Sequence, residues 1–137
     1  MTRIKYDSDL IKLMTMFESM TGAKVKDCIL NENLIFVVEE GEMGKAIGRN
    51  GSNIKRIESR FKKRIKLIEF SNDAVKFVRN MLYPVEVIDI NLESEVITIH
   101  GKDTSSKAMI IGRDRQNINH LIEIVKRHFG IKDIKVV

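Results

Sequence analysis

The stretch Ile47-Gly48-Arg49-Asn50-Gly51-Ser52-Asn53-Ile54-Lys55-Arg56-Ile57 carries the strongest local structural signal in this chain of 137 residues. Gly48 and Gly51 stand three positions apart, and both can take backbone angles that a β-carbon would hinder. Ser52 is a candidate N-cap for a helix in which Ile54 and Ile57 share one face. The pattern therefore predicts a tight glycine loop at the start of a helix.

The same pattern returns 64 positions further along the chain. Ile47-Gly48-Arg49 aligns with Ile111-Gly112-Arg113, Asn53-Ile54 aligns with Asn117-Ile118, and Ile57 aligns with Leu121. Similarity at a fixed spacing indicates an internal repeat, in which one structural unit occurs twice. Chance alignment of apolar residues could explain a few matches, but not a shared order of elements together with a shared loop position.

The first half shows the periodicity of helices and short strands in alternation. A first helix, which Asp7 or Ser8 can cap and Gly22 can end, has an apolar face made of Leu10, Leu13, Met14, Phe17 and Met20. Strands are predicted at 24–30 and 34–39, around a turn at 31–33. A helical turn at 42–47 leads into the glycine loop. The helix from Ser52 turns Ile54, Ile57 and Phe61 inward, and a strand follows at 64–69.

The second half repeats this order. A helix at 73–82 ends before Pro84, because proline cannot continue a helix. Strands follow at 85–92 and 95–100, then helices at 104–111 and 115–129, the latter capped by Gly130, and a last strand at 131–136. The predicted fold class is α+β, with two tandem units of order α-β-β-α-α-β at 1–71 and 72–137. Each unit is expected to hold a three-stranded sheet with helices on one face.

Charge is distributed unevenly along the chain, whose net charge is +5. Nine basic residues lie between positions 42 and 66, opposed only by Glu42 and Glu58, while an acidic stretch of Asp27, Glu32, Glu39 and Glu40 precedes them. Such segregation predicts a basic surface suited to a phosphate backbone, although a solvated helix face is the plainer alternative. One cysteine, no signal peptide and no long apolar run predict a soluble, cytoplasmic protein without membrane contact.

The glycine loop has the features of an anion-binding site. Helix-opening amides lack partners inside the helix, and the helix dipole favours negative charge there. Arg49 lies in the loop, and Lys45, Lys55 and Arg56 lie about one turn away on either side, where each can contact phosphate oxygen. The alternative is an ordinary corner between two helices, in which the glycines only permit the bend.

The pattern Ile47-Gly48-x-x-Gly51-x-x-Ile54-x-x-Ile57 resembles the signature of the KH domain, whose GxxG loop clamps about four nucleotides of RNA or single-stranded DNA. The element order is similar to the prokaryotic, type II form, and two units with almost no linker resemble the tandem KH region of the NusA family of transcription termination and antitermination factors. No polymerase-binding domain and no S1 domain precede the pair, so a short, stand-alone archaeal form is expected.

The resemblance implies specific site residues and partners. Gly48, Arg49, Asn50 and Gly51 would form the backbone clamp, with Lys45, Lys55 and Arg56 beside it and Ile47 and Ile54 lining the base groove or packing in the core. In the second unit, Gly112, Arg113 and Arg115 are the candidates. The expected partner is single-stranded RNA, such as nascent transcript, with RNA polymerase or ribosomal components as further possibilities. A monomer without cofactor is expected.

The second loop departs from the signature. It reads Gly112-Arg113-Asp114-Arg115, so arginine replaces the closing glycine. Arg115 is expected to take a backbone conformation that suits arginine, which would prevent the close approach of RNA. The second unit then either contacts RNA in the same way or serves mainly as a rigid partner, and both readings stay open.

Enzymatic chemistry finds no support in the sequence. Gly44-Lys45 and Gly101-Lys102 lack the other residues of a P-loop, and the three histidines show no metal-ligand spacing with Cys28. A small core residue is the expected role of Cys28. The chain is therefore expected to be a non-enzymatic binding protein. The alternatives to a transcription factor are a KH protein of ribosomal RNA or ribosome assembly, and a protein-interaction adaptor that contacts RNA polymerase.

Overall fold

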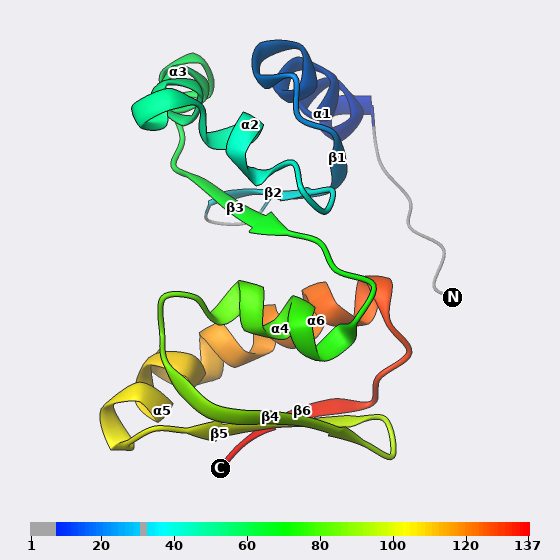
Figure 1. Ribbon diagram of the computed structural model, residues 1–137, viewed down its shortest axis with the longest axis vertical. Helices are drawn as coiled ribbons and strands as arrows, with labels where there is room; N and C mark the ends of the chain where they lie inside the picture. Colours follow the sequence, from blue (N-terminus) through cyan, green and yellow to red (C-terminus); the bar gives the residue numbers. More distant parts are fainter. Residues whose placement is uncertain (1–7, 31–32) are drawn as a thin grey trace. The chain divides into compact units, whose positions relative to one another are not determined.

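The computed structural model describes residues 8–30 and 33–137 (Figure 1). The chain divides into two compact units: the first ends at Ser71, and the second runs from Asn72 to Val137. Each unit holds one three-stranded sheet together with helices, which confirms the predicted α+β class. The predicted cap at Asp7 and the turn residues 31 and 32 lie outside the described residues.

The sheet of the first unit is built around its second strand. The described elements are α1 (Ser8–Thr21), β1 (Val25–Leu30), β2 (Leu34–Val38), α2 (Met43–Ile47), the 3₁₀ turn η1 (Arg49–Gly51), α3 (Ser52–Phe61) and β3 (Ile65–Glu69). β1 pairs antiparallel with β2, and β3 pairs parallel with it. Parallel neighbours need a crossover connection, which α2 and α3 supply. The glycine loop is therefore the midpoint of that crossover (Figure 1).

Aromatic residues hold the helices of the first unit on one face of its sheet (Figure 1). The rings of Phe17 in α1 and Phe36 in β2 stack with centroids 4.2 Å apart, and Phe61 at the end of α3 lies 6.4 Å from Phe36. Ala46 of α2 and Ile57 of α3 are fully buried in the same cluster. Both helices that flank the loop are thus anchored to the sheet, and the loop is held between two fixed ends.

The second unit repeats the element order. Its elements are α4 (Ala74–Leu82), β4 (Val87–Glu93), β5 (Val96–Gly101), α5 (Thr104–Ile111), η2 (Arg113–Arg115), α6 (Gln116–His128) and β6 (Asp133–Val136). β4 pairs antiparallel and β6 parallel with the central β5. Both sheets also carry an irregularity near the start of their first strand, between Val25 and Asp27 in one and between Val87 and Asp89 in the other.

Two details of the sequence prediction are wrong. Ser52 is the first residue of α3 rather than its cap, because Gly51 occupies the cap position with a left-handed backbone. Gly130 does not cap α6: Phe129 is the C-cap, extended, and its ring lies 5.7 Å from that of Phe77. Of the acidic stretch upstream of the loop, Asp27 is completely buried, and its carboxylate accepts the amide hydrogen of Cys28 at 2.8 Å.

No helix among the described residues is both long and apolar enough to cross a bilayer. Cys28 is buried in the core of the first unit, as expected for a small apolar side chain.

Candidate nucleic-acid interface

The glycine loop has a backbone shape that depends on three left-handed or otherwise unusual residues. Gly48 has φ 76° and ψ 172°, Asn50 has φ 55° and ψ 29°, and Gly51 has φ 75° and ψ 16°. Such angles are rare for residues with a β-carbon, although asparagine tolerates the left-handed region better than most. The sequence Gly-Arg-Asn-Gly therefore places permissive residues where this turn needs them.

Gly48 is required by packing as well as by its angles. A β-carbon at Gly48 would lie 2.8 Å from the backbone nitrogen of Asn53 and 2.9 Å from its β-carbon. The Asn53 side chain sits beneath the loop and donates a hydrogen bond from Nδ2 to the carbonyl of Lys45 at 2.8 Å. Asn53 thereby ties the start of α3 to the end of α2. It is a site residue that the sequence prediction did not include.

The left-handed backbone angle at Gly51 favours glycine, but packing does not require it. A β-carbon there would meet only ordinary contacts, the nearest being Ile54 Cγ2 at 3.8 Å and Lys55 Cε at 3.9 Å. Space is thus open on this side of the loop, and Lys55 lies along it. The Gly51 amide donates to the Gly48 carbonyl at 3.2 Å, and the Ser52 amide donates to Arg49. Two of the amides expected to bind an anion are therefore already used inside the loop.

The second loop has the same backbone shape as the first. Gly112 has φ 75° and ψ 171°, Asp114 has φ 54° and ψ 31°, and Arg115 has φ 62° and ψ 20°. The expectation that Arg115 takes a conformation of its own is wrong, because the arginine adopts the left-handed angles of Gly51. Asn117 Nδ2 donates to the Met109 carbonyl at 2.9 Å, as Asn53 does to Lys45.

The residue beneath each loop explains why the shape is kept. A β-carbon at Gly112 would lie 2.6 Å from Asn117 Cγ, so the opening glycine is required here too. At the closing position, the Arg115 amide donates a hydrogen bond to the Gly112 carbonyl at 3.2 Å. A left-handed non-glycine residue costs about 1 kcal/mol, which a well-anchored loop can absorb. A shared asparagine five residues after the first glycine was the sequence signal for this anchor.

Cations flank the first loop, and of these only Arg49 has a basic counterpart in the second, Arg113. Arg49, Lys55 and Arg56 are exposed, and Arg56 donates from Nη1 to Asn53 Oδ1 at 3.3 Å. Positions 64 residues later hold Met109 in place of Lys45, Asn119 in place of Lys55 and His120 in place of Arg56. The second loop itself contains Arg113 and Arg115, both exposed.

Lys45 is partly neutralised by a neighbour. Its Nζ lies 3.5 Å from Glu42 Oε2, one helical turn away. The carboxylate also accepts the amide hydrogen of Lys24 at 2.9 Å. The Lys24 amide, assisted by Lys45, lowers the pKa of Glu42 below its usual value. Glu42 thus joins the start of α2 to Lys24, the residue before β1.

The two predicted groove isoleucines differ in exposure. Ile47 at the end of α2 is 39% exposed, which is unusual for a large apolar side chain and leaves it accessible beside the loop. Ile54 is partly buried and packs against the core cluster of the first unit. Ile47 is therefore the better candidate for contact with a base, and Ile54 chiefly supports α3. Among the described residues, no three His, Cys, Asp or Glu side chains are grouped as metal ligands.

Comparison with known proteins agrees with this geometry. The KH-domain family matches residues 14–100, which include α2, the first glycine loop and α3. This chain is a NusA-like member of the KH-domain family. The probable transcription termination protein NusA of Methanococcus vannielii is 37% identical over 98% of this chain and 80% of its own length. The NusA of Halococcus morrhuae is 31% identical over 98% of the chain and 99% of its own length.

A solved structure also resembles this KH protein over almost its whole length. The crystal structure of APE1850 superimposes with a TM-score of 0.79 at 27% sequence identity, and the match covers 96% of this chain and all of that one. The resemblance therefore extends through both units described above.

Proposed function

We propose that this KH protein is a non-enzymatic, NusA-like factor of transcription termination and antitermination that binds single-stranded RNA such as nascent transcript. We further propose that the segments 1–71 and 72–137 are two type II KH domains in tandem. The observation that carries the proposal is the first glycine loop: an accessible, left-handed backbone between two anchored helices, flanked by the exposed cations Arg49 and Lys55. The names of the curated relatives, probable transcription termination proteins, support the role in transcription.

The loop grips RNA through its backbone and its cations. A phosphate approaches Gly51 on the side where no β-carbon stands, and Lys55 and Arg49 contribute charge-assisted hydrogen bonds. Ile47 offers an apolar contact for a base next to the phosphate. Phosphate contacts supply most of the affinity, whereas the base contacts supply selectivity. Lys45 contributes less than the other cations, because Glu42 opposes it.

Salt dependence tests the electrostatic part of the proposal. Fluorescence anisotropy with a labelled single-stranded oligonucleotide should show log K falling with log salt at a slope of roughly −2 to −4 for three to six phosphate contacts. A slope near zero contradicts the proposal.

The variant Gly51→Asp tests whether RNA phosphate binds at the first glycine loop. Aspartate tolerates left-handed angles, so the loop should keep its shape while the new carboxylate repels the phosphate. RNA affinity should fall at least tenfold. Gly130→Asp is the matched control, because it adds the same charge where a β-carbon meets nothing within 4 Å. Equal affinities of a folded Gly51→Asp variant and the control would remove this loop from the site.

Exchange of the closing residues tests what glycine contributes beyond shape. Gly51→Arg should weaken RNA binding even though it adds a positive charge, because the side chain occupies the open side of the loop. Arg115→Gly should leave the second loop in the same conformation. Tighter binding by Gly51→Arg would show that charge, rather than access to the backbone, limits affinity.

Crosslinking of RNA to the protein in cells tests the class of target. Broad coverage of messenger leaders and nascent transcripts is expected. Predominance of ribosomal RNA would instead assign the protein to ribosome assembly. Capture of RNA polymerase that survives charge reversal at Arg49, Lys55 and Arg56 would assign it the role of a protein adaptor.

A further inference from the structure

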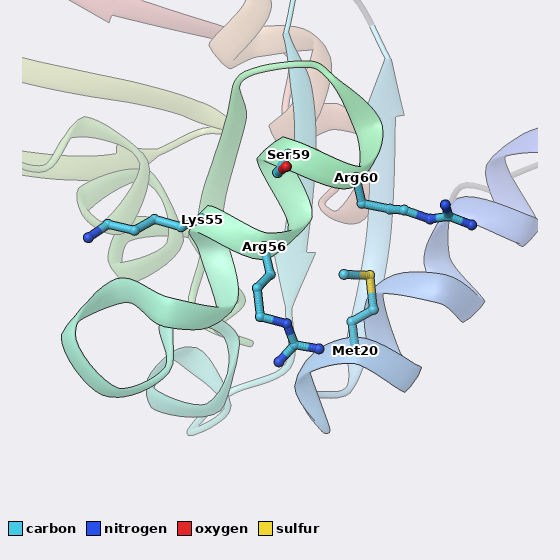
Figure 2. Close-up of a pocket in the computed structure, with 5 residues that line it drawn as sticks. All are labelled: Met20, Lys55, Arg56, Ser59 and Arg60. Carbon is cyan, nitrogen blue, oxygen red and sulfur yellow. The ribbon is translucent and has the colours of Figure 1, made fainter.

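A groove lies on the first unit between α1 and α3, beyond the glycine loop. It has a volume of about 480 Å³ and is lined by Met20 of α1 and by Lys55, Arg56, Ser59 and Arg60 of α3. Figure 2 shows the guanidinium groups of Arg56 and Arg60 extending toward α1 on either side of Met20, while Lys55 points away from them. α3 thus directs two arginines toward α1 at this groove, whereas the end of the Lys55 side chain points away from them.

The charges of the groove arginines are not neutralised, although Arg56 donates one hydrogen bond to Asn53. Within the described part of the chain, no carboxylate lies within ion-pair distance of Arg56 or Arg60. The nearby acidic side chains are engaged with backbone amides: Glu18 accepts from Val25 at 2.9 Å, and Glu58 accepts from Ile65 at 3.1 Å. Two unopposed guanidinium groups beside a thioether form a site for an anion that carries an apolar or aromatic group.

The second unit lacks this arrangement although it repeats the fold. The positions of Arg56, Ser59 and Arg60 are occupied 64 residues later by His120, Glu123 and Ile124. Ile124 is only 3% exposed and belongs to the core of its unit. The fold therefore does not need arginine or serine at these positions. Because the loop shape is common to both units and the basic groove is not, the groove is a feature specific to the first unit.

We propose that the α1–α3 groove is a second nucleotide-binding subsite, which holds the part of the RNA that continues from the glycine loop. This inference rests on the function proposed above and adds a site to it. Arg60 lies nine residues beyond Gly51, about 13 Å along the helix axis at 1.5 Å per residue. A phosphate binds between Arg56 and Arg60 as a charge-assisted contact, and the attached base lies against the Met20 thioether. The volume suits one nucleotide, since small-ligand pockets start at roughly 300 Å³.

The length of RNA provides the test. Anisotropy is measured with uridine oligonucleotides of four and eight nucleotides, because the shorter one fills the loop site and the longer one reaches the groove. Arg60→Gln should weaken binding of the eight-nucleotide RNA about five- to tenfold, reduce its salt slope by about 1, and leave the four-nucleotide RNA unaffected. Ser59→Glu, which introduces the carboxylate found at Glu123, should act in the same direction. Arg79→Gln on α4 is the control and should change neither affinity.

The outcomes separate this subsite from the proposed function. If neither RNA binds the wild type, the proposed function fails. If Gly51→Asp weakens both RNAs while Arg60→Gln and Ser59→Glu change neither, the loop stands and the groove proposal is overturned. Both substitutions lie on the exposed face of α3, and unchanged urea midpoints establish that the variants are folded. Binding of polyglutamate that is lost in Arg60→Gln, with RNA binding unaltered, would assign the groove to an acidic protein partner instead.

Discussion

At the scale of single residues, the two glycines of the first loop have different roles. Gly48 has a left-handed φ and no room for a β-carbon, because Asn53 fills the space beneath it. Gly51 has a similar φ but open space, and the equivalent Arg115 shows that a side chain is compatible with that backbone. Glycine at 48 therefore builds the loop, whereas glycine at 51 keeps one side of it clear.

Gly48→Ala should destabilise the protein substantially. The new methyl group would overlap the backbone of Asn53, which belongs to α3 and cannot move away freely. A loss of about 1–3 kcal/mol in the free energy of unfolding is expected for a strained backbone forced to relax. Urea denaturation measures it.

Gly44→Ala is the matched control for that substitution. Gly44 lies in α2 with nothing within 4 Å of an added β-carbon. Alanine is the better helix former, so this variant should be unchanged or more stable by up to about 1 kcal/mol. If the two variants lose equal stability, the explanation from Asn53 is wrong.

At the scale of secondary structure, the tightest turn of the second unit joins β4 to β5. Glu93 pairs with Val96, which leaves Ser94 and Glu95 as a two-residue turn with φ 52° and 65°. Positive φ at both positions is the type I′ geometry that matches strand twist and prefers Asn-Gly. The hairpin forms in spite of its turn residues, because β5 is the central strand and is paired on both sides.

Replacing Ser94-Glu95 by Asn-Gly should stabilise the second unit. The double substitution Ser94→Asn with Glu95→Gly puts residues that tolerate left-handed angles at both turn positions. The free energy of unfolding is expected to rise by about 1 kcal/mol. Thermal denaturation followed by circular dichroism measures the gain. Glu93→Gly, one position earlier and inside the strand, is the control and should destabilise. A decrease in the melting temperature of the double variant would contradict the strain argument.

Glu42 at the start of α2 should make the stability of the protein depend on pH. The Lys24 amide, with help from Lys45, lowers the folded-state pKa of Glu42. The contribution of Glu42 to stability is therefore complete above the pKa of a glutamate in the unfolded chain, about 4.3. It disappears as the pH falls through the lower folded-state pKa. The wild type should be more stable than Glu42→Gln at pH 7, and the difference should vanish in acid.

Urea midpoints between pH 3 and pH 7 measure this difference. When Lys45 is also replaced by Gln, the effect of Glu42→Gln on stability should vary less with pH, because one of the interactions that lowers the pKa of Glu42 is absent. A difference between wild type and Glu42→Gln that grows toward acid pH would show that the sign has been assigned wrongly.

At the scale of the whole molecule, the positive charge is concentrated in one half. The chain has 14 basic and 10 acidic residues up to Ser71, and 10 basic and 9 acidic residues from Asn72 onward. The two loops share a backbone shape, but only the first is surrounded by additional cations. A common scaffold therefore carries two surfaces of different charge, and we expect the first to dominate binding to a polyanion.

Neutralising two cations in each half should reveal this asymmetry. The double variant Arg49→Gln with Lys55→Gln should reduce the salt slope of RNA binding by about 1.4, at roughly 0.7 for each phosphate that is no longer neutralised. Arg113→Gln with Arg115→Gln should reduce it by less than half as much, although the same number of charges is removed. Equal reductions would mean that both loops hold the RNA backbone alike.

Much of the fold can be predicted because its signals are local. The apolar periodicity of Phe17 and its neighbours, the helix stop at Gly22 and the repeat of Ile-Gly-Arg at 47 and 111 depend only on nearby residues. Errors occur where packing competes with a local preference. Phe129 becomes extended to reach Phe77, so Gly130 is not needed as a cap, and Gly51 takes the cap position that Ser52 was expected to fill.

The sequence by itself determined the duplicated α-β-β-α-α-β order, the loop position and the basic segment, since these follow from spacing and composition. Only the tertiary structure decided which glycine is indispensable, because the reason is the Asn53 side chain folded beneath Gly48. It likewise decided that Arg115 keeps the left-handed shape and that Arg56 and Arg60 face Met20 across a groove. Those relations join residues on different elements, and the pattern along one chain does not show which side chains meet across the space between two elements.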